Sequence, residues 1–289
     1  MNTGSHPSSR VAVVTGAATG LGSATVRALL AAGWTVVATR LPGQPAQEGM
    51  ERARFVEADL RTADAPARVA AAAEEAGGAA LFVSSAGISL PGPVELRADD
   101  LATEFAVNTA APARIVAALL PQLRRTRGRV VLIGAGQGRV ALPFGAGYAA
   151  SKAGLVAIAD ALRAEVRHDG ITVSLIEPGA VRTGILDASR DRARVLMTDA
   201  SDEARERYSV PLARSLDAAG RAFANAMPPE RVAELVLTIS RARTPRPRYL
   251  IGREAWVVAA LALLPARWRA GLVAKLGAEP RSRGRSTAS

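Results

Sequence analysis

Near its N-terminus the chain has a short apolar run that leads directly into three closely spaced glycines. Val11–Thr15 has the length and continuous apolar character of a buried parallel strand. Glycines follow at positions 16, 20 and 22, and residues 21–32 repeat apolar side chains at helical spacing until Gly33. Between a strand and a helix, such glycines permit a tight turn and let backbone N–H groups approach pyrophosphate oxygens. The segment therefore predicts a dinucleotide-binding turn in an α/β fold.

The rest of the chain continues this alternation of strands and helices. Further strands are expected at residues 34–39, 55–57, 81–84, 130–133 and 172–176. Two long helices are expected over residues 98–125 and 145–167. This alternation favours a Rossmann-type doubly wound parallel sheet of about seven strands, flanked by helices. Because the chain has 289 residues and no recognisable linker, we expect a single domain.

Composition and charge exclude several kinds of site. The chain has no Cys, so it has no disulfides, thiolate nucleophiles or cysteine metal ligands. It has only two histidines, His6 and His168, and we expect neither a histidine triad nor a metal site. The net charge of +11 comes mostly from arginines scattered among Asp and Glu, without a basic stripe interleaved with aromatics. We therefore expect a small-molecule substrate and no nucleic-acid partner.

The second of the long predicted helices contains Tyr148-Ala-Ala-Ser-Lys152. Residues four apart on a helix lie one turn apart, so this phenol and this ammonium can face one substrate. A phenol with a pKa near 10 is a poor base at neutral pH, and a neighbouring ammonium stabilises its phenolate form. Because the chain has only three tyrosines and two lysines, such a pair rarely arises by chance.

Taken together, the glycine turn and the Tyr–Lys pair resemble the short-chain dehydrogenase/reductase family, over roughly residues 10–252. The resemblance implies oxidoreduction with a nicotinamide cofactor. It also implies that Tyr148 exchanges a proton with the substrate oxygen and that Lys152 holds the nicotinamide ribose. Asn108 matches the family asparagine that supports a water chain to the lysine. We therefore take Tyr148, Lys152 and Asn108 as the catalytic residues.

The resemblance also assigns cofactor-binding residues along the chain. The glycine turn supplies Thr15, Gly16, Thr19, Gly20, Leu21 and Gly22. Asp59 and Leu60 match the adenine site, and Pro178, Gly179, Val181 and Thr183 match the carboxamide site. Tyr148 and Lys152 belong to the cofactor site as well. Ser84-Ser85-Ala86-Gly87 stands where the family usually has Asn-Asn-Ala-Gly, so Ser85, Ala86 and Gly87 are assigned with a departure from the pattern.

The end of the second predicted strand indicates which nicotinamide cofactor binds. An acidic residue there would accept hydrogen bonds from the ribose 2′-OH of NAD(H). This chain has Thr39-Arg40 instead, and a guanidinium can pair bidentately with a 2′-phosphate. We therefore predict NADP(H) rather than NAD(H), although Thr19 stands where many NADP-preferring relatives have a second basic residue.

One catalytic position departs from the family pattern. Ungapped spacing from Tyr148 places Ala135 where the family has a serine that polarises the substrate carbonyl. A methyl group cannot donate, and losing one such donor typically costs a factor of about 10²–10³ in rate. The Gln137 amide is the preferred replacement, and the hydroxyl of Ser84 or Ser85, an ordered water or the substrate's own hydroxyl remain open as well.

Three functions follow from this departure, and the sequence does not choose the substrate. The first is an atypical ketoreductase or dehydrogenase acting on a small or hydrophobic carbonyl or alcohol. The second is a non-redox catalyst of cyclisation, dehydration or isomerisation that uses Tyr148 as acid or base. The third is a non-catalytic NADP(H)-binding protein. The intact Tyr–Lys pair favours the first two, whereas the departures at Ala135 and Ser84-Ser85 favour the last two.

Several segments lie outside the core pattern. Residues 1–9 are expected to be a flexible leader, and residues 277–289 a disordered basic tail. Residues 184–226, mixed in charge, are expected to be irregular and to form the substrate lobe. Residues 253–276 suggest two amphipathic helices broken at Pro265; their 12-residue apolar run, 255–266, is too short to span a bilayer. We expect these helices to pack on the domain or on a partner subunit rather than to lie in a membrane interface.

Location and assembly are expected from the same features. The start of the chain has neither the charged region nor the apolar stretch of a signal peptide, and we expect a cytoplasmic protein. In the resembled family the helix that contains the Tyr–Lys pair forms subunit contacts. Small side chains on that helix, such as Ala153, Ala157 and Ala161, favour close helix packing. We therefore expect a homodimer or homotetramer.

Overall fold

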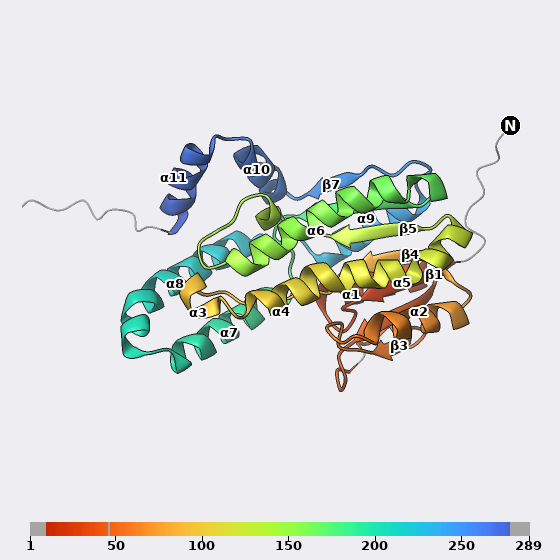
Figure 1. Cartoon of the computed structure of the whole chain (residues 1–289), viewed down its shortest axis with the longest axis horizontal. Coiled ribbons are helices and arrows are strands. Elements are labelled where there is room, and N and C mark those ends of the chain that lie inside the picture. Colours follow the sequence, from red (N-terminus) through yellow and green to blue (C-terminus); the bar gives the residue numbers. More distant parts are fainter. Residues whose placement is uncertain (1–9, 46, 278–289) are drawn as a thin grey trace, which may run out of the picture.

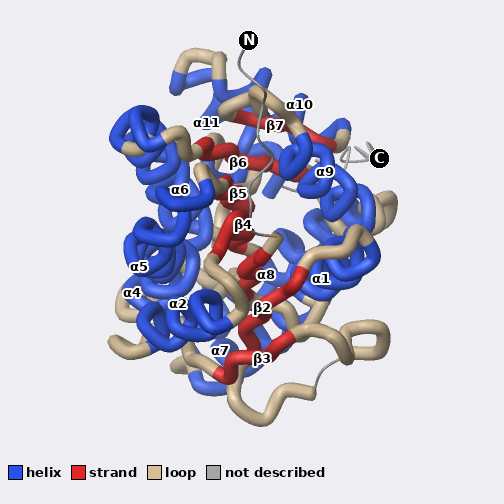
Figure 2. The backbone as a smooth tube through the Cα atoms, turned by 90° about the vertical axis from the view of Figure 1, so that its right-hand side faces the viewer, coloured by secondary structure: helices blue, strands red, loops and turns tan. Residues whose placement is uncertain are grey.

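One parallel sheet organises the molecule. The computed structural model describes residues 10–45 and 47–277, with side chains described to residue 274. Its strands are β1 (Val11–Thr15), β2 (Thr35–Arg40), β3 (Arg54–Glu57), β4 (Ala79–Ser84), β5 (Arg129–Ile133), β6 (Thr172–Pro178) and β7 (Arg248–Ile251). They pair in parallel in the order β3-β2-β1-β4-β5-β6-β7 (Figure 2). This confirms the predicted doubly wound sheet, and the strand order reverses between β1 and β4.

Helices cover both faces of the sheet (Figure 2). On one face lie α1 (Gly20–Ala31) and α9 (Pro229–Arg241), which pack on β1, β2 and β4. On the other lie α2 (Ala65–Glu75), α5 (Ala111–Thr126) and α6 (Ala146–Glu165). The central strands β1 and β4 are buried along their whole length, which explains why they are apolar runs without alternation. The sheet thus has an apolar core on each face.

The helix predicted over residues 98–125 is more finely divided than expected. It is preceded by α3 (Val94–Arg97), begins with α4 (Leu101–Phe105), passes through a π turn at Ala106–Ala110 and continues as α5 to Thr126. Apolar periodicity does not reveal a π turn, because one extra residue per turn only shifts the phase of the pattern. Helix α6 lies within the predicted range 145–167.

The expectation that residues 184–226 are irregular is wrong. The segment forms α7 (Ile185–Asp199) and α8 (Asp202–Phe223), which lie together at one end of the molecule (Figure 1). Ser201 caps α8, since its hydroxyl accepts from the N–H of Ala204 at 3.2 Å. The mixed charges that suggested irregular structure are ion pairs one helical turn apart, such as Arg194–Asp191 and Arg207–Glu203.

The C-terminal segment follows β7. It contains α10 (Arg253–Ala262) and α11 (Ala266–Gly277), with Pro265 between them. These helices leave large apolar side chains exposed, among them Trp256, Leu263 and Trp268. Among the described residues, the helices are too short or too polar to cross a membrane. The leader predicted at 1–9 lies outside the described residues, as does the tail predicted at 277–289 except for Gly277, which ends α11.

Candidate active site

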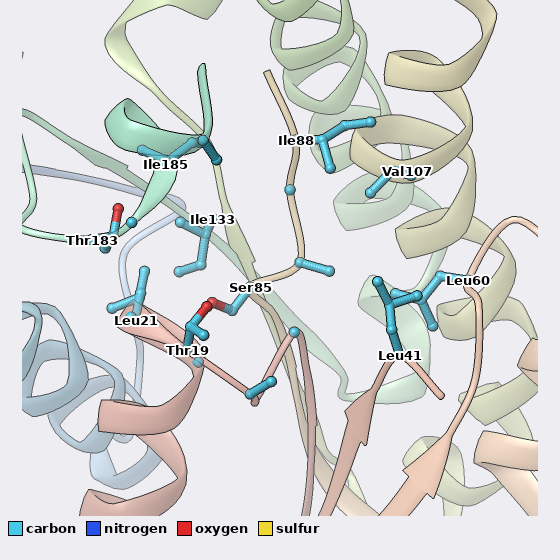
Figure 3. Close-up of a pocket in the computed structure, with 18 of the residues that line it drawn as sticks. Thr19, Leu21, Leu41, Leu60, Ser85, Ile88, Val107, Ile133, Thr183 and Ile185 are labelled. Atoms are coloured by element: carbon cyan, nitrogen blue, oxygen red, sulfur yellow. The ribbon is translucent and has the colours of Figure 1, made fainter. Parts of the chain in front are cut away.

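A cavity opens at the carboxyl ends of the strands, beside the point where the strand order reverses. It has a volume of about 740 Å³, within the range of small-molecule and cofactor sites. The turn after β1, the ends of β2, β4, β5 and β6, and helices α6 and α7 all contribute to its lining. Figure 3 shows Thr19 and Leu21 from the glycine turn, Ser85 after β4 and Thr183 after β6 around this one pocket.

The glycine turn forms one wall of the cavity and has no room for a side chain at Gly16 or Gly22. Gly16 has a φ of +67°, and a Cβ there would lie 2.7 Å from the Cα of Ala86. A Cβ on Gly22 would lie 2.1 Å from the carbonyl oxygen of Gly16. Thr19 precedes the first turn of α1 and its side chain does not cap it, so the N–H groups of that turn remain available to an acceptor. This wall fits a pyrophosphate group.

Two buried threonines hold this wall in place. The hydroxyl of Thr15 accepts hydrogen bonds from the N–H groups of Ser85 and Ala86, at 3.1 and 3.3 Å. The hydroxyl of Thr39 accepts from the N–H of Gly16 at 3.2 Å. Thr15 itself does not line the cavity, so its place is structural. The other predicted cofactor residues do line it: Gly16, Thr19, Gly20, Leu21, Gly22, Thr39, Arg40, Asp59, Leu60, Ser85, Ala86, Gly87, Tyr148, Lys152, Pro178, Gly179, Val181 and Thr183.

Arg40 lies at the end of β2, at the edge of the cavity. Its Nη2 donates to Oε1 of Glu57 at 3.0 Å, and its guanidinium carbon lies 4.9 Å from the centre of the Phe55 ring. Its buried Nε has no hydrogen-bond partner among the described residues. Nearby, Arg61 donates to Asp59 and lowers the pKa of that carboxyl. At this end of the cavity, the Arg40 guanidinium is therefore fixed in position, and its Nε–H lacks a hydrogen-bond acceptor within the part of the chain that the structure describes.

Tyr148 and Lys152 both face the cavity from α6. The Nζ of Lys152 donates to the carbonyl oxygen of Ile133 at 2.9 Å and lies 5.8 Å from the centre of the Tyr148 ring. Burial raises the pKa of Tyr148 to about 12, and the nearby Glu104 carboxylate acts in the same direction. Burial lowers the pKa of Lys152 to about 8. Two groups shifted in this way within one cavity are typical of a site that moves protons.

Asn108 lies behind the cavity rather than in its wall. It is fully buried in the π turn, and its Oδ1 accepts from the N–H of Ile88 at 2.9 Å. Its Nδ2 donates to the carbonyl oxygen of Ile88 at 2.9 Å and to the hydroxyl of Ser151 at 3.0 Å. Asn108 thus ties the segment after β4 to the helix that contains Tyr148. A Cβ on Gly87 would lie 3.4 Å from Asn108 Oδ1 and 3.7 Å from Lys152 Nζ, so both groups approach this glycine closely.

Ala135 lines the cavity two residues after β5. Its backbone is extended, and a 3₁₀ turn, Gly136–Gly138, follows it. Of the side chains suggested as replacement donors, Ser85 lines the cavity, whereas Gln137 does not and lies beside Gly145. Ser84 is buried at the end of β4 and does not line it either.

The individual residues of the other half of the cavity were not predicted, although residues 184–226, which supply part of it, were expected to form the substrate lobe. Ile88, Leu90, Thr103 and Val107 contribute from the segments near β4 and α4, and Ile185, Ala188, Arg192 and Phe223 contribute from α7 and α8. Figure 3 shows Ile88, Val107 and Ile185 around this part of the pocket. On α7 the lining residues recur at helical spacing, and that spacing is the signal that could have revealed them. Apart from Arg192 and Thr103, this half is apolar.

The doubly wound sheet with a glycine-lined cavity beside its switch point defines a Rossmann-type dinucleotide-binding protein. Within that class, the chain belongs to the short chain dehydrogenase family, whose profile matches residues 10–194.

Named relatives and solved structures agree with this placement. The chain is 34% identical over 215 residues to retinol dehydrogenase 16 of Mus musculus, a match that covers 71% of the chain and 68% of the relative. It is 31% identical over 177 residues to 3-amino-tetrahydro-pyrrolizinone reductase of Xenorhabdus hominickii, covering 60% of the chain and 62% of that reductase. The match thus spans less than two thirds of the reductase's length.

Two solved structures share the fold. A short-chain dehydrogenase from Streptomyces avermitilis superposes with a TM-score of 0.71 at 24% identity, covering 92% of this chain and 96% of that one. A short chain dehydrogenase from Burkholderia cenocepacia, in complex with NADP, superposes with a TM-score of 0.70 at 24% identity, covering 94% and 98%.

Proposed function

We propose that the protein is an NADP(H)-dependent short-chain oxidoreductase that interconverts a carbonyl and an alcohol, most simply as a ketoreductase. The observation that carries this proposal is that Tyr148 and Lys152 line the same cavity as the glycine turn. A dinucleotide on that turn and a substrate beside Tyr148 would therefore share one cavity. Family membership supports the same reaction class.

The preference for NADP(H) rests on Arg40. Its guanidinium is fixed by Glu57 and Phe55, and its Nε still lacks an acceptor. A 2′-phosphate would supply a charged acceptor there, whereas the 2′-OH of NAD(H) would leave the guanidinium facing a neutral group. The Burkholderia cenocepacia relative in complex with NADP is consistent with this choice.

The chain's own residues would divide the reaction in the following way. The bound nicotinamide would supply or accept a hydride at the substrate carbon. Tyr148 would donate its phenolic proton to the carbonyl oxygen during reduction and take a proton back during oxidation. Burial raises the pKa of Tyr148 to about 12, so the phenol carries its proton at neutral pH, and the Lys152 ammonium would stabilise the negative charge that develops when this proton leaves. Asn108 keeps the Ile88 segment and α6 in register around both groups.

We assign Ala135 to the position of the family's carbonyl-polarising serine. Ala135 follows β5 and lines the cavity with Tyr148, as that role requires, but its methyl group donates no hydrogen bond. The Ser85 hydroxyl is the side chain best placed among the suggested replacements, because it also lines the cavity. The enzyme would then work with one donor fewer near its carbonyl site.

The substrate class is proposed from the lining of the second half of the cavity. Ile88, Leu90, Val107, Ile185 and Phe223 give it an apolar surface, which favours a hydrophobic carbonyl or alcohol. A retinol dehydrogenase is among the relatives, and its name gives a largely apolar alcohol as the substrate of that protein.

The test compares the wild-type protein with Ala135→Ser, using Tyr148→Phe as a control that keeps the fold but removes the proton donor. NADPH absorbance is followed against a panel of ketones and diketones, and NADPH and NADH binding is titrated by fluorescence. We expect wild-type turnover, a gain of up to about 10²-fold for Ala135→Ser and loss of turnover for Tyr148→Phe. NADPH is expected to bind more tightly than NADH.

Other results of this experiment would contradict separate parts of the proposed function. If the wild type turns over and Ala135→Ser is no faster, another donor has taken over the role of the serine and the enzyme is a true reductase. If only Ala135→Ser consumes NADPH, the natural protein is a non-redox or non-catalytic scaffold. If product forms without stoichiometric loss of NADPH, the reaction is a cyclisation, dehydration or isomerisation. Tighter binding of NADH would overturn the assignment of Arg40.

A further inference from the structure

The segment between β4 and α3, residues 88–92, contributes Ile88 and Leu90 to the second, mostly apolar half of the cavity. We call these residues the substrate segment and that half of the cavity the substrate half. The substrate segment has no regular secondary structure, yet the rest of the protein holds its backbone at every residue. Asn108 holds both the N–H and the carbonyl of Ile88. Arg192 Nη1 donates to the carbonyl oxygen of Ser89 at 3.1 Å, and Arg97 Nε donates to the carbonyl oxygen of Pro91 at 3.4 Å. The N–H of Leu90 donates to Glu104 Oε1 at 2.9 Å, and the N–H of Gly92 donates to the carbonyl oxygen of Phe144 at 2.9 Å.

Glu104 is the most unusual member of this set, because its carboxyl group is buried. The residue lies on α4 and is only 2% exposed. Its Oε1 accepts from Leu90, and its Oε2 reaches the first turn of α6 at Gly147, directly before Tyr148. A Cβ at position 147 would lie 1.8 Å from that oxygen, so a glycine is required there. Glu104 therefore fills the space between the substrate segment and the start of the catalytic helix.

Three charged groups and the Tyr148 phenol surround this carboxyl. Arg97 on α3, Asp100 before α4 and Arg192 on α7 act on it electrostatically, and Glu104 in turn acts on Tyr148 of α6. Burial raises the pKa of Glu104, against the lowering effects of the Leu90 N–H and the two arginines. Burying an ionisable group is costly, and an apolar side chain would fill the same space with less loss of solvation. The carboxyl is thus suited to a task that an apolar side chain cannot perform.

We propose that Glu104 is a positioning residue of this active site, which holds the Leu90 backbone against the first turn of α6 and so sets where a substrate lies relative to Tyr148. The proposal rests on the function proposed above for Tyr148, but its structural part does not need turnover to be tested.

Two arginines extend the same arrangement to α7. Arg97 pairs with Asp100 at 2.6 Å, and its Nη2 donates to the carbonyl oxygen of Arg192 at 3.1 Å. Arg192 in turn donates to the carbonyl oxygen of Ser89, so α7 bonds to the substrate segment directly. Arg97 adds an indirect link, because it also donates to the carbonyl oxygen of Pro91. A change at Glu104 should therefore be felt at the substrate half of the cavity and not at the glycine turn, which lies on the other side of β4.

The experiment compares Glu104→Ala, which removes the acceptor, with Glu104→Gln, which keeps an acceptor for Leu90 but removes the charge. Asp99→Asn, at an exposed neighbouring position, is the matched control. For Glu104→Ala we expect KM for a reducible ketone to rise about tenfold, the equivalent of one lost hydrogen bond, with NADPH binding unchanged. Hydrogen exchange of the peptide that contains residues 88–92 should become faster in the same variant. Glu104→Gln should restore both.

The pH profile separates positioning from simple packing. Removing the negative charge of Glu104 makes the Tyr148 phenolate easier to form, so the pH above which reduction slows should be lower in Glu104→Gln than in the wild type. A side chain that only fills space would leave this limb of the profile in place. If Glu104→Ala does not fold, Gly147→Ala replaces it, since a Cβ at position 147 would displace the Glu104 carboxyl from its place.

The outcomes distinguish this proposal from the proposed function. If exchange at residues 88–92 and KM are the same in Glu104→Ala and Asp99→Asn, the positioning role is wrong. If no variant, including the wild type, reduces a ketone but exchange at residues 88–92 still rises in Glu104→Ala and returns in Glu104→Gln, the reductase function fails and the structural role of Glu104 stands.

Discussion

At the scale of single residues, the active site depends on two groups whose ionisation the fold has altered. Tyr148 and Lys152 were predicted from their spacing, but from the sequence alone each would be assigned the ordinary pKa of an exposed side chain. Burial in the cavity raises the pKa of Tyr148 to about 12 and lowers that of Lys152 to about 8. The phenol therefore keeps its proton at neutral pH, and the ammonium is held charged at some cost to stability.

Lys152→Met should remove that cost while abolishing turnover. An unfolded lysine keeps its proton up to pH 10.5, whereas folded Lys152 loses it near pH 8. Between these values the unfolded state binds more protons, so wild-type stability rises with pH, and below pH 8 the full cost remains. We expect Lys152→Met to raise Tm by about 3 °C or more at pH 7, with the difference shrinking toward pH 10.5. Thermal unfolding across this range measures it.

Tyr148→Phe serves as the control, because it keeps the lysine and should keep the wild-type dependence of Tm on pH. A constant difference between Lys152→Met and the wild type at all pH values would show that the buried ammonium does not titrate in this window.

At the scale of secondary structure, the π turn between α4 and α5 and the helices α7 and α8 shape the site. The π turn directs two consecutive polar residues toward α6: Thr109 donates to the carbonyl of Ser151 at 2.7 Å, and Asn108 donates to the Ser151 hydroxyl. The π turn thus contains the residue that bridges Ile88 and α6.

Asn108→Ala should destabilise the protein and not only slow it. The change leaves the N–H and carbonyl of Ile88 without their partners in a buried place, which we expect to cost about 2 kcal/mol or more in the free energy of unfolding. Urea unfolding measures this as a lower midpoint with an unchanged slope. Asn225→Ala, at an exposed position, is the matched control. Equal losses in the two variants would contradict the bridging role of Asn108.

At the scale of the whole molecule, the exposed face of α6 is where we propose that subunits meet. Ala153, Ala157 and Ala161 are exposed and recur every four residues along one side of the helix, so a partner helix could approach closely. On the C-terminal segment, Trp256, Leu263 and Trp268 also have exposed apolar side chains. A homodimer or homotetramer would cover the exposed face of α6.

Ala157→Arg should weaken that assembly. An arginine in the middle of a close helix contact would bring a bulky charge into a space suited to small side chains. We expect light scattering after size-exclusion chromatography to give a dimer or tetramer for the wild type and a smaller species for Ala157→Arg. Ala71→Arg, on the exposed side of α2, should leave the mass unchanged. A monomeric wild type would contradict the proposal.

Local pattern was enough to predict the parallel sheet, the glycine turn and the Tyr–Lys pair. Continuous apolar runs, glycine spacing and helical periodicity are properties of neighbouring residues, so they can be read before the chain folds. The same information misjudged residues 184–226, because ion pairs along a helix look like mixed charge in a linear sequence.

Only the tertiary structure decided how distant segments meet. It brings Glu104 between Leu90 and Gly147, places Arg40 against Glu57 and Phe55, and keeps Gln137 out of the cavity where Ser85 lies. It also moves the pKa values of Tyr148 and Lys152 in opposite directions. These features depend on burial and on contacts between residues far apart in the chain, and both arise only when the sheet and its helices have packed.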